Sequence, residues 1–310
     1  MATKLITTGE LLLAPTGLDW STLAEKLGLT DQDPSSAAQA IEQAFIIDSA
    51  SEWVANFCEQ TRGLQSTQQT EVARIARVAH FGTKAWVDSE GTLKFKAEGL
   101  PITSVDAMSY AMSPGPLVYN TIAPGSTQIT GRHPQMFTIS EMSSNWEPLK
   151  FSAAYLQVQY TAGYPNAVLT AAVTAGANKT LTVDSTLGMA TSNTQNPEML
   201  TYQSNLRIYD GLLSEDVVVT SVLDATRITV ANLVNAHDPT SGQGLVGGIG
   251  VSGLPRDIKW ATIMAATHFA RQRGTQAMTM NSARGSMASK SAGDLLSEAE
   301  FLLEPWVMKV

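Results

Sequence analysis

Apolar residues recur at helical spacing near the start of the chain. Between residues 33 and 60, Ile41 and Phe45 lie four positions apart, and Trp53 and Phe57 repeat that spacing. Residues four apart share one face of an α-helix, so these side chains predict an amphipathic helix with a single apolar face.

The helical pattern returns near the end of the chain. Pro255 suits the first turn of a helix, and apolar residues then follow the helical period at Ile258, Ala261, Met264, Ala265 and Phe269. A last helix is predicted over LLSEAEFLLE, and Pro305 ends it.

Between these helical regions the pattern has a period of two. Segments such as TEVARIARV, GTLKFKA and residues 155–160 alternate apolar and polar side chains. This alternation is typical of half-buried strands. Helices followed by a small sheet indicate the α+β class.

A separate alternating stretch occupies residues 170–250, where Leu181 and Val183 are among the apolar positions. Segments rich in Ala, Gly and Thr flank it. The pattern predicts an all-β sandwich or small barrel, inserted at a surface turn and able to fold independently. We therefore divide the chain into a core, residues 1–169 and 251–310, and an inserted β domain.

Composition narrows the function classes. Among 310 residues, 44% are hydrophobic but only 15% are charged, so the surface is expected to be rich in uncharged polar groups. Such a surface suits a protein that is covered by neighbouring proteins in an assembly. The net charge of −8 argues against tight binding of nucleic acid, which needs clustered Lys and Arg. The single cysteine, Cys58, excludes an internal disulfide and fits a reducing cytosol. No apolar run is long enough to predict a membrane span.

Residues that could carry chemistry do not form a convincing site. Gly242, Gly244 and Gly247 match GxGxxG, but no strand precedes them and no helix follows, as a dinucleotide site requires. Asp48 and Glu52 share a predicted helix face and are expected to be solvated. The remaining candidates are an acidic hairpin tip without calcium-site spacing, at Asp210, Glu215 and Asp216, and four histidines without ligand spacing, at His80, His133, His237 and His268. We predict no catalytic residue, no cofactor and no metal.

The order of several short motifs is more informative than any one of them. PITSV is followed by WEPL, VQYTAGYP, the proline-started helix LPRDIKWATIMAATHFARQRG, and finally LLSEAEFLLEPW. In this order the chain resembles the head–tail connector (adaptor) proteins of tailed bacteriophages. The resemblance covers about residues 33–169 and 251–310. Residues 170–250 depart from the pattern and look like the small β domains of phage structural proteins.

The resemblance implies a helical connector core with a small sheet, plus the inserted β domain. It also implies a structural virion protein, not an enzyme, which is assembled in the host cytoplasm and located in the neck of the particle. Its expected partners are the portal protein, its own copies in a dodecameric ring, and a tail or stopper protein below. DNA is expected to pass through the ring without specific binding, and the acidic balance of the chain agrees with that.

The C-terminal segment is the predicted portal-docking arm. Its apolar residues are Phe301, Leu302, Leu303, Trp306, Val307 and Met308. Pro305 disfavours helix at the residue before it, so an extended apolar tail is expected. The alternative is that this segment folds back onto its own core.

Other functions stay open. The second hypothesis is another phage structural protein, such as a tail-completion or decoration protein, in which the β insert carries the function. An enzyme is third, because no carboxylate pair is positioned for catalysis, and a DNA-binding module is fourth because of the charge.

Overall fold

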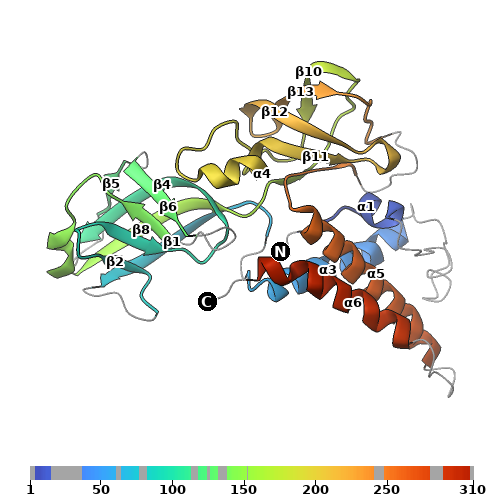
Figure 1. The fold of residues 1–310 in the computed structure, drawn as a ribbon, viewed down its shortest axis with the longest axis horizontal. Helices are drawn as coiled ribbons and strands as arrows, with labels where there is room; N and C mark the ends of the chain where they lie inside the picture. The colour runs from blue at the N-terminus through green and yellow to red at the C-terminus, as the bar shows by residue number, and fades with distance from the viewer. Residues whose placement is uncertain are drawn as a thin grey trace.

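The structure is a computed structural model that describes residues 4–14, 37–60, 64–76, 82–112, 118–123, 126–131, 138–151, 153–240, 248–279 and 289–307. Figure 1 shows three parts: an eight-stranded sheet, a six-stranded sheet, and a group of helices beside them. The two β-sheets dominate the architecture of the described chain.

The eight-stranded sheet curls into a half-barrel with the strand order β5-β4-β8-β1-β2-β3-β7-β6. Its strands are β1 (Thr67–Ala76), β2 (Ala85–Val87), β3 (Leu93–Lys96), β4 (Ile102–Met112), β5 (Asn120–Ile122), β6 (Thr127–Thr130), β7 (Thr138–Glu141) and β8 (Ala154–Ala162). The long strands β1, β8 and β4 are antiparallel, and side chains such as Phe95, Leu156 and Tyr160 fill the core. A short helix, η2 (Glu147–Phe151), precedes β8.

The six-stranded sheet is antiparallel, with the order β10-β13-β12-β11-β14-β9. Its strands are β9 (Asn166–Val168), β10 (Gly176–Thr182), β11 (Asn205–Tyr209), β12 (Glu215–Asp224), β13 (Arg227–Leu233) and β14 (Gly250–Ser252). Short helices η3 (Pro197–Met199), α4 (Leu200–Ser204) and η4 (Gly211–Leu213) connect them. The first strand and part of the last lie outside residues 170–250, so this sheet extends beyond the predicted insert on both sides.

Strand β10 forms one edge of this sheet and is not regular. Asn178 has a φ of 51°, and the pairing with β13 passes from Ala177 directly to Lys179. The ammonium group of Lys179 donates to the hydroxyl of Thr174, 3.0 Å away. The edge therefore carries an irregularity and a cation.

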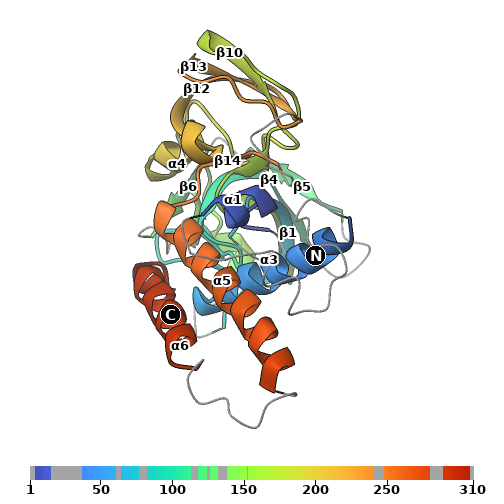
Figure 2. The same cartoon turned by 90° about the vertical axis from the view of Figure 1, so that its right-hand side faces the viewer.

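The helices pack as a layer below the six-stranded sheet in Figure 1. They are α1 (Thr8–Leu13), α3 (Ala37–Phe57), α5 (Arg256–Thr279) and α6 (Ser289–Leu303), followed by η5 (Glu304–Trp306). Figure 2 shows α5 between α3 and α6. No helix in the described ranges has the length and apolar character needed to cross a membrane.

The predicted helical connector core with a small sheet is wrong. The alternating stretch before residue 163 builds a sheet of eight strands with its own hydrophobic core, so the helices are the minor component. The inserted part is a single antiparallel sheet in the described chain, so of the two predicted shapes the two-sheet sandwich is not formed. The chain after β9 bonds to the end of β10, with the Thr170 amide 2.9 Å from the Thr182 carbonyl and the Asp184 amide 3.0 Å from the Val168 carbonyl, which closes the sheet toward the small barrel. Alternation locates strands, but it does not count how many of them join one sheet.

The predicted apolar face of the first long helix is also wrong in part. Ile41 and Phe45 are 76% and 55% exposed. The face that packs inward contains Ile46, Ile47, Ala50 and Val54. Helix α3 has apolar residues on more than one side, so spacing alone did not identify the buried side.

Candidate functional site

The end of β8 is the point where the two sheets and the helical layer meet. Gly163 has a φ of 100°, a conformation that side chains with a Cβ rarely adopt. A Cβ there would also overlap the backbone carbonyl of Gln65. The Gly163 amide donates to the carbonyl of Pro101 at 2.8 Å, which ties the end of β8 to the start of β4.

Tyr164 is the centre of a hydrophobic cluster that joins distant segments. Its ring is fully buried and makes edge contacts with Tyr202, at 5.2 Å between centroids, and Trp306, at 6.3 Å. Burial raises the pKa of the Tyr164 hydroxyl well above its ordinary value, so this group stays neutral. Other members of the cluster include Leu64, Leu254, Ile258, Met264 and Leu303.

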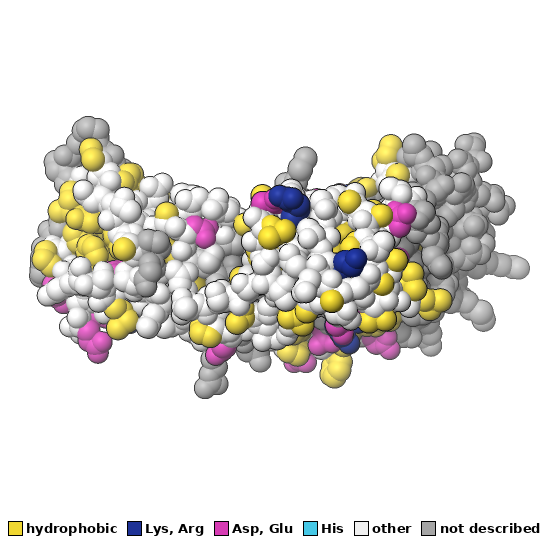
Figure 3. Space-filling view, turned by 90° about the horizontal axis from the view of Figure 1, so that it is seen from above, with side chains coloured by type: hydrophobic (Ala, Val, Ile, Leu, Met, Phe, Trp, Pro, Cys, Tyr) yellow, Lys and Arg dark blue, Asp and Glu magenta, His cyan; other side chains and the backbone are white. Residues whose placement is uncertain are grey.

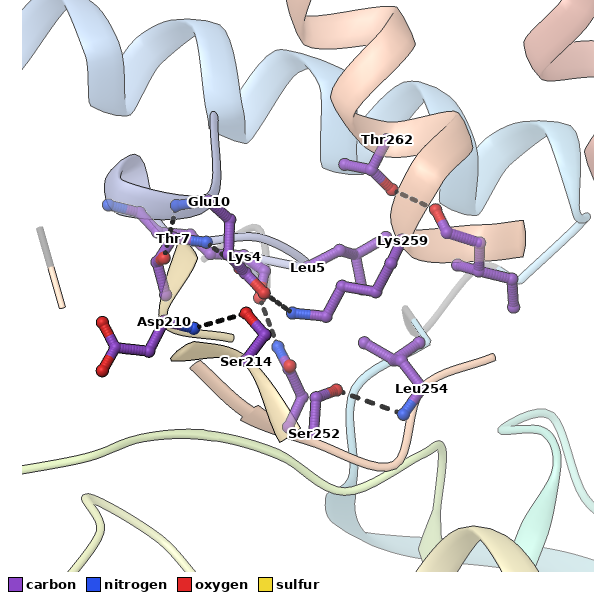
Figure 4. A network of polar contacts seen from close by, with 12 residues as sticks. Lys4, Leu5, Thr7, Glu10, Asp210, Ser214, Ser252, Leu254, Lys259 and Thr262 are labelled. Atoms are coloured by element: carbon purple, nitrogen blue, oxygen red, sulfur yellow. Dashed lines mark hydrogen bonds and ion pairs between the residues drawn. The ribbon is translucent and has the colours of Figure 1, made fainter. Parts of the chain in front are cut away.

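A buried ion pair connects the N-terminal segment to α5 (Figure 4). The ammonium group of Lys259 lies 2.7 Å from the carboxylate of Glu10 and 4.7 Å from the ring centroid of Tyr209. Burial lowers the pKa of Lys259, and the neighbouring Glu10 carboxylate opposes that change. Glu10 also accepts a bond from the amide of Thr7, whose hydroxyl in turn caps α1.

Further bonds hold this N-terminal segment in place. The amide of Leu5 donates to the hydroxyl of Ser51 on α3 at 3.0 Å, and the side-chain amide of Asn166 on β9 donates to the carbonyl of Lys4 at 2.9 Å. Residues 4–10 therefore link the helical layer to the six-stranded sheet.

The buried His237 lies between two carboxylates in the six-stranded module. Its Nδ1 is 2.8 Å from Asp210 and its Nε2 is 3.0 Å from Glu215. Burial raises the pKa of Glu215, but bonds from the backbone amides of Val234 and Asn235 and from His237 lower it overall. Both ring nitrogens are engaged, so the cluster holds together three residues that are 22 and 27 positions apart in the sequence. Asp210 and Glu215 were expected at a solvated hairpin tip, and no spacing in the sequence indicated that His237 would join them.

The other predicted candidates do not assemble into a reactive site. Cys58 is fully buried, and burial raises the pKa of its thiol to about 12, so it is not a nucleophile. His268 is buried on α5, Asp216 pairs with Arg207 and Arg256, and Glu52 is exposed on α3. His80, His133, Gly242, Gly244 and Gly247 lie outside the described residues. Within the described ranges, no group of three or more His, Cys, Asp or Glu side chains could hold a metal ion.

The predicted docking arm is divided between the core and the surface. Leu303 is buried, and Leu302 and Trp306 pack against the cluster around Tyr164. Val307 is half-buried, and Met308 lies outside the described residues. Phe301 is 75% exposed. The portal-docking role stays a prediction, and Phe301 is the residue most available for it.

The helical layer exposes large apolar side chains beside acids. Phe301 on α6 is next to the exposed Glu300 and close in sequence to Glu298 and Glu304, and Ile41 and Phe45 lie exposed on α3. Exposed apolar side chains beside acids suit contact with a surface that combines apolar residues with cations.

In comparisons with known proteins, no family model, no curated protein and no solved structure matches the chain.

Proposed function

We propose that this protein is a structural component of the neck of a tailed bacteriophage. In this role it forms a ring beneath the portal, extends the DNA channel and joins the head to the tail or stopper protein. The observation that carries the proposal is the convergence of three of the five connector-like motifs on the buried Tyr164.

Three of the five motifs come from distant parts of the sequence but share one cluster, whereas Trp146 and Leu149 of WEPL belong to the half-barrel core. VQYTAGYP supplies Tyr164, the proline-started helix supplies Leu254 and Ile258, and LLSEAEFLLEPW supplies Leu303 and Trp306. PITSV is joined to the same place by the bond between Gly163 and Pro101. A shared cluster gives the order of the motifs a physical reason, because together they form the framework from which both β modules extend. This shared cluster supports the proposed connector function even though the sheets are larger than expected.

Charge agrees with a role in DNA passage. The chain has 20 Lys and Arg against 28 Asp and Glu. On the face seen in Figure 3, basic side chains do not form an extended patch, and some of them lie beside acidic ones. A channel wall without basic clusters lets DNA slide without holding it, because phosphate contacts depend on Lys and Arg.

The proposal is tested by mixing the purified protein with its cognate portal protein and imaging the particles by electron microscopy. The expected result is an added ring layer on one face of the portal. The free protein is expected to assemble only on the portal, so the protein alone is the control. Portal particles without an added layer would contradict the neck role.

Two variants of α6 separate portal docking from folding. Phe301→Asp changes an exposed side chain, so we expect stability within roughly 0.5 kcal/mol of the parent and clearly weaker portal binding. Leu303→Ala removes a buried side chain and is expected to cost ~2–5 kcal/mol of unfolding free energy. Urea denaturation and portal co-sedimentation measure the two effects. Parental portal binding by Phe301→Asp would exclude this residue from the docking surface.

The second candidate is a tail-completion or decoration protein. It is favoured by two apolar side chains on the six-stranded module, Leu212 and Val234, which are 100% and 72% exposed. Antibody labelling of intact particles separates the neck role from a decoration role, because the neck role predicts label at the head–tail junction and a decoration role predicts it over the capsid.

A further inference from the structure

The half-barrel has two open sides that face a loop of the other β module. Within the described chain, β5 pairs with β4 only from Met108 to Tyr110, which leaves the first half of β4 without a strand on that side. At the opposite end of the sheet, β6 is the last strand. Unpaired backbone groups at such edges need other partners.

Gln195 bonds to both of these edges. Its side chain accepts a bond from the amide of Val105 at 2.8 Å and donates to the carbonyl of the same residue at 3.3 Å, as a neighbouring strand would. The side-chain amide also donates to the hydroxyl of Thr127, at 2.8 Å, and the backbone carbonyl of Gln195 accepts from the amide of Ile129, at 3.2 Å. One residue therefore spans the opening between β4 and β6.

Two asparagines on either side of Gln195 hold it in position. The side-chain amides of Asn193 and Asn196 each donate at 2.6 Å to a carbonyl of β4, on Thr103 and Ile102 respectively. The side-chain oxygen of Asn193 also accepts bonds from the amides of Gln195 and Asn196, which fixes the local turn.

This loop supplies several of the contacts between the modules, and the side-chain amide of Gln65 adds another, donating to the carbonyl of Asn166 on β9 at 2.7 Å. A cleft of about 670 Å³ lies beside the loop, with Gln68 and Asp106 of the half-barrel on one side and Leu187 and Gln203 of the six-stranded module on the other. The yellow segment that leads into α4 crosses toward β4 and β6 in Figure 1. A short contact next to a cleft can control the angle between two modules.

We propose that residues 193–196 are a clip that closes the half-barrel and, in doing so, fixes the six-stranded module against it. This inference does not depend on the neck role, because it concerns how the two β modules of one chain are held together. Release of the clip would open the β4 edge and free the six-stranded module to turn about the chain segments near Gly163 and Gly253.

The angle between the modules can be measured with two spin labels. Glu90→Cys and Ala231→Cys place thiols at exposed positions on the two modules. The native Cys58 is fully buried, so it stays unlabelled. Pulsed electron–electron double resonance on the doubly labelled protein is expected to give one narrow distribution of distances between the two labels. Combined Gln195→Ala and Asn196→Ala changes are expected to broaden or shift it, whereas Thr194→Ala, an exposed neighbour in the same loop, should leave it unchanged.

A second measurement is hydrogen exchange of backbone amides on β6, a strand to which the side chain of Asn196 does not bond. Asn196→Ala removes a bond to β4 only, yet the clip predicts faster exchange of the Ile129 amide on β6, because Gln195 moves with its neighbour. This single variant is milder and serves if the double variant does not fold. An unchanged label distance together with an unchanged Ile129 amide would overturn the clip.

Discussion

At the residue scale, Lys259 is the side chain whose environment differs most from what its type suggests. It lies on a helix, where a lysine is normally exposed, but it is buried against Glu10 and the ring of Tyr209. Removing one member of a buried ion pair leaves the other charge without compensation.

We therefore expect Lys259→Met alone to lower the unfolding free energy by ~3–5 kcal/mol. Adding Glu10→Gln should recover most of that loss, because the uncompensated carboxylate is gone and glutamine still serves the capping box. Urea denaturation of the two single variants and the double variant completes the cycle. Losses that simply add would mean that the pair is not coupled.

Gly163 gives a second prediction at this scale. Gly163→Ala combines an unfavourable φ with overlap of the Gln65 backbone, so it should cost at least ~1–3 kcal/mol and lower the yield of folded protein. Gly82 is the matched control, because its φ is 86° and a Cβ there meets nothing within 4 Å. If thermal melts show the same loss of stability for Gly163→Ala and Gly82→Ala, the positive φ alone explains the cost, and the overlap with the Gln65 backbone contributes nothing.

At the element scale, Glu141 at the end of β7 holds the neighbouring loops. Its buried carboxylate accepts bonds from the Ser126 hydroxyl at 2.6 Å, the Ser143 amide at 2.8 Å and the indole N–H of Trp146. Burial raises the pKa of Glu141, but these donors lower it overall to below its ordinary 4.5. The stability that they contribute is therefore present above pH 4.5 and is lost as the pH falls through the lowered pKa.

Glu141→Gln should remove this pH dependence and cost ~1–3 kcal/mol at neutral pH, since an amide is a weaker acceptor and brings donors of its own. Chemical denaturation at several pH values between neutral and acid measures the change. Glu90→Gln, on an exposed turn, is the control. A variant that keeps the parental slope below pH 4.5 would show that other carboxylates cause the acid sensitivity.

Local elements were the part of the fold that sequence predicted well. The alternation at 155–160 lies inside β8, and the helix expected after Pro255 begins at Arg256. The side of α3 that is buried was not predictable, because Ile41 and Phe45 fit an apolar face as well as Ile46 and Val54 do. The His237 cluster and the clip were also missed, because each depends on contacts between residues far apart in the sequence.

At the scale of the whole molecule, the division into core and insert gives a testable expectation. Replacing residues 170–250 with a short Gly-Ser linker should leave a cooperative melt for the rest, because closing a surface loop costs little. The melt should come at a lower temperature than in the parent, since β9 and β14 lose partners and the half-barrel loses Gln195. Loss of cooperativity would place the insert in the core, and an unchanged melting temperature would count against the clip.

The arrangement of the three parts could not be read from the sequence. Pairing of β1 with β8 and of β8 with β4 joins distant segments, and local periodicity carries no information about such partners. The candidate docking surface was predictable only as an apolar segment. Which of its residues face solvent follows from how α6 lies against α5 and Tyr164.

The irregular edge strand β10 has a consequence for behaviour at high concentration. A straight exposed edge invites another chain to add a strand, and repeated addition leads to aggregation. The positive φ at Asn178 and the cation of Lys179 make this edge irregular, and the carbonyl of Thr182 at its end already accepts a bond from the amide of Thr170 at 2.9 Å. Addition of a strand from a second copy is therefore disfavoured at this sheet edge, even at high protein concentration.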